Sequence, residues 1–187
     1  MYLGSHSKHP YFLFKKQLHR IGVYKTITHD LKEGNCKQLD YKTILLEQGY
    51  LIYLCASWQG YIENLFTFYH DTLINDLDSE RIKLTLELKR ENLMKRFNTP
   101  NLQNINQLAK ELFGVEKFFD KVSIKGIELS ELKSNLDDLL KARHQVAHKA
   151  KCDDKYLNEN SVIKNVEWIV KLAFALTKEI HTELGYE

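Results

Sequence analysis

Residues 51–73 read LIYLCASWQGYIENLFTFYHDTL, and the spacing of the apolar side chains in this stretch decides the fold. Steps of three or four residues separate Leu51, Cys55, Trp58, Ile62, Leu65, Tyr69 and Leu73. An α-helix turns once in about 3.6 residues, so these side chains line one face of a single long helix. The pattern predicts a helix that starts near Asp40 and buries this stripe in a core.

Helical spacing also governs the rest of the chain, and no alternating strand pattern of convincing length occurs. A first helix is predicted from Pro10 to Gly34, with an apolar stripe at Phe14, Leu18, Ile21, Tyr24, Thr28 and Leu31. A charged helix is predicted over residues 78–97. A last helix is predicted from the stripe Val162, Val166, Ile169, Ala173, Leu176, Ile180 and Leu184.

Two further helices are predicted from their end signals. Thr99 is a candidate N-cap with Pro100 at the first helical position, and Gly114 is the predicted end of that helix. Ser130 is the predicted cap of a helix that carries Leu132, Leu136, Leu139 and Leu140. Residues 115–128 and 149–159 are predicted connectors.

Length and composition fit one helical domain. The chain has 187 residues, of which 43% are hydrophobic and 28% charged, and it is long enough to build a core without disulfides or metals. It contains only two prolines and eight glycines, so few turns are marked and long helices are favoured. We therefore predict a single domain over residues 1–187, an all-α bundle with long central helices that pack antiparallel.

Charge and cysteine content exclude several classes of protein. Lys and Arg number 27 against 25 Asp and Glu, a net charge of +2, which excludes a histone-like binder and an acidic disordered tail. Cys36, Cys55 and Cys152 form no CxxC pair, so neither a zinc site nor a disulfide framework is expected, and no cofactor is predicted. The longest largely apolar run, residues 50–58, is far shorter than the about 20 residues that a membrane helix needs. No secretory signal is apparent, so we expect a cytoplasmic protein without membrane association.

The segment LLKARHQVAH at residues 139–148 places an arginine within an apolar stripe. Helical steps from Leu136 and Leu139 lead to Arg143 and then to Val146, so Arg143 stands where a core leucine is expected. A guanidinium stays charged in a protein and is costly to bury unpaired. Arg143 must therefore reach the edge of the bundle, pair with an internal acid or face a polar groove, and the residues alone leave these alternatives open.

Two histidines follow this arginine on the same predicted helix. His148 lies about 140° around the helix from Arg143, so one ideal helix does not aim both at one point. Either the helix ends or bends near Ala147, or two chains contribute to a shared site. His144 and His148 are four residues apart and share a face, a spacing that can hold a metal. No Glu lies between them and the sequence marks no third ligand, so no metal site is predicted.

The stretch Arg143-His144-Gln145-Val146-Ala147-His148 resembles the Arg-x4-6-His motif of the HEPN superfamily, small helical proteins that include many ribonucleases of toxin–antitoxin and other defence systems. Residues 56–65, which contain Trp58 and Glu63 as Trp-x4-Glu, resemble the long second helix of the RiboL-PSP-HEPN branch. Residues 97–114 resemble its middle segment, and residues 136–148 its RNxxAH stretch. The resemblance runs from about residue 40 to the C-terminus. It departs at His144, where that branch usually has Asn.

The resemblance implies a metal-independent endoribonuclease of a toxin or defence system, with RNA as substrate and a homodimer in which two motifs line one cleft. In that role His148 takes or gives a proton, because histidine titrates near neutral pH. Arg143 holds the phosphate through two hydrogen bonds, and His144 contacts the phosphate or orients the other two side chains. Attack by the ribose 2′-OH would give a 2′,3′-cyclic phosphate and a 5′-OH.

Two other functions stay open. One is a catalytically silent HEPN-like module that binds a partner protein, either an antitoxin or a defence subunit. The other is a helical domain in which the motif arose by chance, because a fold alone does not establish a function.

Other polar residues carry weaker hypotheses. On the long helix, Gln59, Glu63 and His70 fall to one side of the apolar stripe. Glu63 is predicted to pair with Arg143 or to orient His148, and an equally good alternative is a solvated helix face. Residues 81–96 hold six Lys or Arg against two acids, which favours either an RNA-binding surface or, more commonly, a solvated face. Trp58 and Trp168 lie on apolar stripes and are predicted core residues.

Overall fold

The computed structural model describes residues 8–151 and 159–186, and these residues form a helical domain. The elements are α1 (Pro10–His19), α2 (Gly22–Glu33), α3 (Leu39–Asn75), α4 (Glu80–Arg96), α5 (Leu102–Phe113), the 3-10 helix η1 (Phe118–Lys121), α6 (Leu129–Lys149) and α7 (Glu159–Glu183). Within the described ranges, strand-like pairing is limited to one isolated bridge between Ile124 and Ile127. The predicted all-α class is confirmed.

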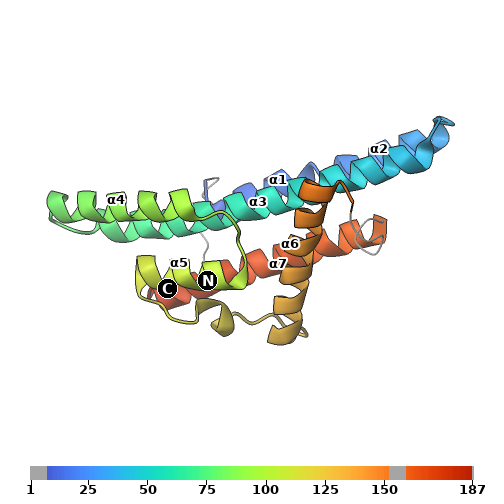
Figure 1. Cartoon of the computed structure of the whole chain (residues 1–187). Coiled ribbons are helices and arrows are strands. Elements are labelled where there is room, and N and C mark those ends of the chain that lie inside the picture. The colour runs from blue at the N-terminus through green and yellow to red at the C-terminus, as the bar shows by residue number, and fades with distance from the viewer. Residues whose placement is uncertain (1–7, 152–158, 187) are drawn as a thin grey trace.

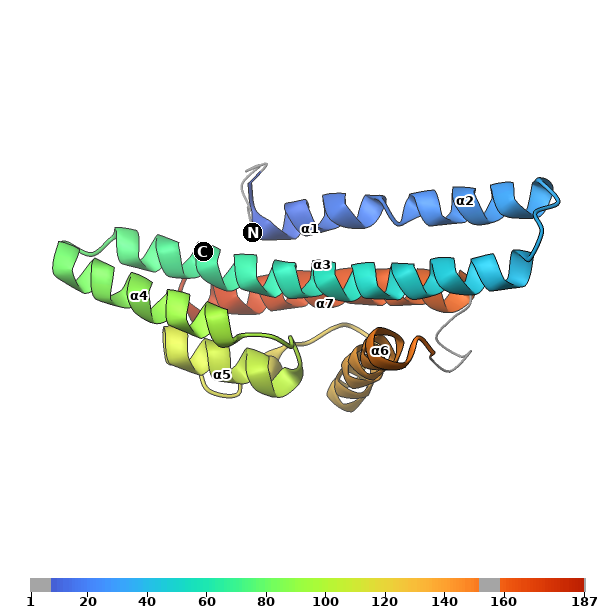
Figure 2. The same cartoon turned by 45° about the horizontal axis from the view of Figure 1, so that its top comes forward.

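Helix α3 is the axis of the domain (Figure 1). Helices α1 and α2 run along one side of α3, α7 runs along another, and α4 folds back along the C-terminal half of α3 (Figure 2). Helix α6 crosses the long helices instead of running beside them (Figure 1). The C-terminal end of α6, which carries the candidate motif, therefore meets the middle of α3.

The predicted stripe of α3 is buried from Leu51 through Tyr69, with Trp58 at 0% exposure. At the end of the stripe Ile74 is buried, whereas Leu73 is only half-buried. The buried face is wider than predicted and includes Tyr61, because α1, α6 and α7 all pack on α3. Trp168 is also buried, so the prediction that both tryptophans belong to the core is confirmed.

Tyr61 ties α3 to α7 by hydrogen bonds as well as by packing. Its hydroxyl donates to the carbonyl oxygen of Ala173 at 2.5 Å and lies 2.7 Å from the Oγ1 of Thr177. All three residues are buried, so these bonds satisfy polar groups that water does not reach.

The N-terminal helix is two helices, not one. The helix is interrupted at Arg20 and Ile21. Around this point the backbone amides donate hydrogen bonds to the carbonyl oxygens three residues earlier, as seen for Arg20, Ile21, Val23 and Tyr24. Such bonds tighten the turn, and Gly22, a poor helix former, follows directly. The break leaves Phe14, Leu18 and Tyr24 buried against α3 as the stripe predicts.

Two predicted caps are wrong. Asn101, not Thr99, caps α5, because its side-chain oxygen accepts a hydrogen bond from the Asn104 amide at 2.8 Å. Helix α6 begins at Leu129 after Glu128, so Ser130 lies inside its first turn. The predicted end at Gly114 is confirmed, with a left-handed φ of 73° that glycine adopts without strain.

The connector over residues 115–128 is partly helical, which the sequence pattern did not predict. Its η1 turn buries Phe118 and Phe119, and the Phe119 amide donates to the side chain of Asn106 at 2.7 Å. A single turn is too short to show a period, so only packing reveals it. Within the 149–159 connector, residues 152–158 lie outside the described part of the chain.

Candidate functional site

A groove opens between α3, α6 and the segment that joins α4 to α5. It is lined by Ile52, Cys55, Ala56 and Gln59 of α3, by residues 98–100, and by Leu140, Arg143 and His144 of α6. A second hollow shares Thr99, Leu140 and His144 with it and continues along α6 past Asp137, Lys141, Gln145 and Lys149. The three shared residues place the two hollows side by side along α6.

The floor of the groove is fixed by hydrogen bonds from buried or half-buried side chains. The indole Nε1 of Trp58 donates to the carbonyl oxygen of Pro100 at 3.2 Å. The side-chain nitrogen of Asn104 donates to the carbonyl oxygen of Thr99 at 2.7 Å. The 98–101 segment is thereby tied both to α3 and to the first turn of α5, and it presents a defined polar surface to α6.

The wall formed by α6 is held against α3 near its C-terminal end. The side-chain nitrogen of Gln48 donates to the carbonyl oxygen of Ala150, which caps α6, at 3.1 Å. Ala142 and Val146 are buried on either side of Arg143 along the helix. Ala142 thus fills the close-packed position, and Arg143, expected where a core leucine would stand, is displaced to the half-buried edge.

Arg143 reaches the half-buried edge of the bundle and lines the groove there, which combines two of the alternatives that the sequence left open. It forms no ion pair or hydrogen bond with any residue that the structure describes. The buried thiol of Cys55 lies within its electrostatic reach. Burial raises the pKa of that thiol to about 12, and the opposing effect of the Arg143 charge is smaller. Cys55 is therefore a neutral neighbour, and the Arg143 charge is left available to an anion.

His144 and His148 lie side by side on the exposed face of α6. Their ring centroids are 4.3 Å apart, and both residues are exposed. His144 lines the groove together with Arg143. Helix α6 continues through both residues to Lys149, so it neither ends nor breaks at Ala147. His144 instead occupies the arc between Arg143 and His148.

The described residues contain no group of three His, Cys, Asp or Glu side chains arranged to hold a metal ion. His144 and His148 therefore have no third protein ligand within that part of the chain. The donor set that a protein-bound zinc or iron requires is not assembled around them.

Glu63 lies one helical turn beyond Gln59, and its carboxylate accepts a hydrogen bond from the Gln59 side chain at 2.9 Å. Within the described residues it forms no ion pair with Arg143 or His148. Gln59 lines the groove, so Glu63 acts on the groove only by orienting Gln59. The catalytic role predicted for Glu63 stays a prediction.

The polar flank predicted on α3 is not uniformly solvated. His70 is only 3% exposed and its ring packs at the edge of Phe113. Burial, reinforced by the nearby charge of Arg90, lowers the pKa of His70 below its ordinary value. His70 is therefore a core residue that favours the neutral form, which the helical-wheel position alone did not indicate.

The basic residues of α4 are divided between structural contacts and solvent. Lys83 pairs with Glu80, Arg90 pairs with Asp71, and Lys89 donates to the carbonyl oxygen of Glu111. Three exposed cations form no ion pair within the described residues, namely Arg81, Lys95 and Arg96. Lys95 and Arg96 end α4, just before the 98–100 segment that lines the groove.

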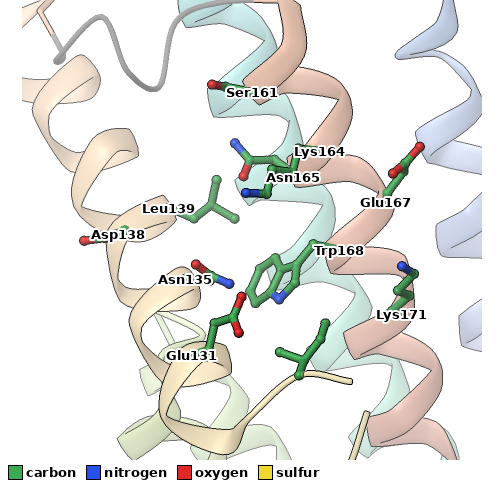
Figure 3. Close-up of a pocket in the computed structure, with 11 residues that line it drawn as sticks. Glu131, Asn135, Asp138, Leu139, Ser161, Lys164, Asn165, Glu167, Trp168 and Lys171 are labelled. Atoms are coloured by element: carbon green, nitrogen blue, oxygen red, sulfur yellow. The ribbon is translucent and has the colours of Figure 1, made fainter. Parts of the chain in front are cut away.

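A separate cleft of about 370 Å³ lies between α6 and α7. Figure 3 shows Glu131 and Asn135 of α6 facing Asn165 and Trp168 of α7 across it. Asn135 precedes His144 by nine positions, which is about 180° around the helix. This cleft is therefore on the other side of α6 from the histidine pair and is not part of the groove.

Sequence reasoning found the residues of α6 but missed the groove that surrounds them. Gln59, Asn98 and Thr99 come from segments far from the motif, and no short pattern links them to Arg143.

In the described part of the chain, no helix is long and apolar enough to cross a membrane.

Comparison with known proteins gives one match. The family model described as RiboL-PSP-HEPN matches residues 24–182, which contain the groove, Arg143 and both histidines. No curated protein and no solved structure matches the chain.

Proposed function

The chain belongs to the RiboL-PSP-HEPN family, a family of predicted ribonucleases, and on this premise we propose that it is a metal-independent endoribonuclease of a toxin or defence system. The observation that carries the proposal is Arg143, a half-buried guanidinium that faces a groove and has no partner within the described residues. A protein stabilises a buried or half-buried charge through a partner, so an unpaired one at a groove suits an anionic ligand.

The proposed chemistry assigns each group by its residue type. Arg143 holds a phosphate of the RNA backbone and stabilises the negative charge that grows on its oxygens in the transition state. His148 carries a proton between the RNA and solvent. The ribose 2′-OH attacks the adjacent phosphate and releases a 5′-OH, which leaves a 2′,3′-cyclic phosphate. None of these steps requires a metal ion.

A homodimer is part of this proposal. The histidines lie on the exposed face of α6, so a second chain can bring its own α6 to the same cleft without displacing any core contact of the first. Sedimentation equilibrium of the purified chain tests it, with a dimer mass expected and a monomer at all concentrations as the contrary result.

RNA cleavage by wild type and His148→Ala tests the function itself. Both proteins are incubated with total cellular RNA in EDTA, and the product ends are analysed for cyclic phosphate. We expect cleavage by wild type and at least about a 10²-fold loss in the variant, the usual contribution of a positioned proton carrier. The fold of the variant is checked by circular dichroism. Equal cleavage by both proteins would remove His148 from the mechanism.

A second candidate function is a partner-binding module, and exposed aliphatic residues on α4 favour it. Ile82, Leu84 and Leu88 are each more than half exposed, at 53%, 57% and 51%. Leu84 and Leu88 are four residues apart and therefore share one face of α4, a spacing typical of anchors for another helix, whereas Ile82 lies about 160° around the helix from Leu84. Co-purification of a stoichiometric antitoxin or defence subunit that is lost in Leu84→Glu would support this candidate, and it is compatible with a nuclease that the partner restrains.

A further inference from the structure

His144 and His148 have no structural task within the described part of the chain. Both are exposed, and apart from their mutual contact neither ring has a hydrogen-bond partner there. Histidine side chains that merely cap or brace a helix are usually held by a carboxylate or a carbonyl. The four ring nitrogens are therefore free to exchange protons with a bound molecule.

Cleavage of RNA through its 2′-OH needs two proton transfers, and the two rings are placed for both. The attacking 2′-oxygen must lose a proton, and the departing 5′-oxygen must gain one. The two oxygens lie on opposite sides of one phosphorus atom. His144 lines the groove together with Arg143, and the centroid of the His148 ring lies 4.3 Å from that of His144, so the two imidazoles can reach the two sides of a phosphate held at Arg143.

We propose that His144 and His148 form an acid–base pair that acts on one scissile phosphate, an inference that rests on the proposed ribonuclease function. The neutral imidazole of one accepts the 2′-OH proton as the bond from the 2′-oxygen to phosphorus forms. The imidazolium of the other donates its proton to the 5′-oxygen as the bond from phosphorus to that oxygen breaks. The pair ends with its protonation states exchanged, and solvent restores them. No oxidant, metal or other reactant is consumed.

Among the described residues that line the two hollows, few others titrate or carry charge. On α6 these are Asp137, Lys141, Arg143 and Lys149. On α3 the titratable group is the Cys55 thiol, which burial keeps neutral, and residues 98–101 contribute only uncharged groups. The rate should therefore rise and then fall with pH, because the reaction needs one imidazole in its neutral form and the other in its protonated form.

The test measures kcat/KM against pH, in EDTA, on two substrates. One is uridylyl-adenosine, whose 5′-oxygen needs a proton to leave. The other is uridine 3′-(p-nitrophenyl phosphate), whose leaving group departs without one. The proteins are wild type, His144→Ala, His148→Ala and the control His29→Ala, which removes an exposed histidine of α2, a helix that contributes no residue to the groove. Circular dichroism confirms that each variant is folded.

We expect a bell-shaped profile for wild type and for the control, and the loss of one limb in each groove variant. On uridylyl-adenosine both groove variants should fall by about 10²- to 10⁴-fold. On the nitrophenyl substrate one of the two should recover close to the wild-type rate, which identifies it as the acid, and the other should stay low. A merely structural histidine would not distinguish the two substrates.

Four results would overturn the pair. His144→Ala with both limbs intact and a rate within a few-fold of wild type would remove His144 from proton transfer. Equal losses of both variants on both substrates would indicate a positioning role, and cleavage abolished by EDTA would assign the rings to a metal. Wild-type protein that cleaves neither RNA nor either substrate at any pH would remove the proposed function, and the pair with it.

Discussion

Arg143→Met separates a catalytic role of this arginine from a structural one. The substitution keeps an unbranched side chain of similar length and removes the charge. Arg143 has no ion pair within the described residues, so no partner loses its counter-charge. Its stem is only half-buried, and even Arg143→Ala removes about two half-buried methylenes, worth about 1 kcal/mol. The free energy of unfolding should therefore change by less than about 1 kcal/mol in Arg143→Met.

Catalysis should respond far more strongly to the same change. A donor that stabilises the transition-state charge typically contributes about 10²- to 10³-fold to kcat. We expect RNA cleavage to fall by at least this factor while the urea midpoint and the m-value stay near those of wild type. Breaking a buried ion pair, in contrast, costs about 3–5 kcal/mol. A destabilisation of that size, or cleavage at the wild-type rate, would refute the assignment of Arg143 to the phosphate.

Three further predictions concern RNA binding and stability. The variant Lys95→Gln/Arg96→Gln should bind 2′-O-methyl RNA, which cannot be cut, about 25-fold more weakly than wild type at 0.1 M salt. The slope of log K against log salt should become shallower by about 1.4, because two phosphate contacts are lost. Tyr61→Phe should lower the free energy of unfolding in urea by about 1–3 kcal/mol, because two buried hydrogen-bonding groups on α7 lose their partner. The pKa of His70 is lowered in the folded state, so the unfolded state binds more protons below about pH 6.5 and stability should fall as pH decreases through that range. His70→Gln should show a smaller fall, measured as urea midpoints from pH 7.5 to 5.

Matched comparisons make these predictions decisive. Lys16→Gln/Arg20→Gln removes the same two charge types from α1 and its C-cap, which contribute no residue to the groove, and should leave RNA affinity unchanged. An unaltered salt slope in Lys95→Gln/Arg96→Gln would assign the exposed face of α4 to a protein partner instead. A Tyr61→Phe variant within a few tenths of a kcal/mol of wild type would show that water replaces the hydroxyl. Equal pH dependence in His70→Gln would place the acid sensitivity elsewhere.

The helices themselves follow from local patterns in the sequence. The stripe of α3 could be predicted because apolar side chains repeat with the helical period over many turns. The helix end at Gly114 could be predicted because a left-handed residue after a helix is usually glycine. The wrong predictions mainly concern where a helix begins or ends. Asn101 and Thr99 are equally good caps by composition, and the Trp58 hydrogen bond to Pro100 helps to decide between them by holding the preceding turn in place.

The candidate site divides in the same way. The sequence by itself determined the residue types of the motif, their place on one helix and the angle between Arg143 and His148, because helix geometry is local. Packing of the helices was needed to show that Ala142 takes the core position, that Arg143 lines a groove without a partner in the described chain, and that His70 is buried. Burial and pairing depend on which elements cross, and α6 meets α3 through contacts between residues far apart in the chain, such as Gln48 and Ala150. No periodicity within either helix specifies that crossing, so the groove exists only once the domain has packed.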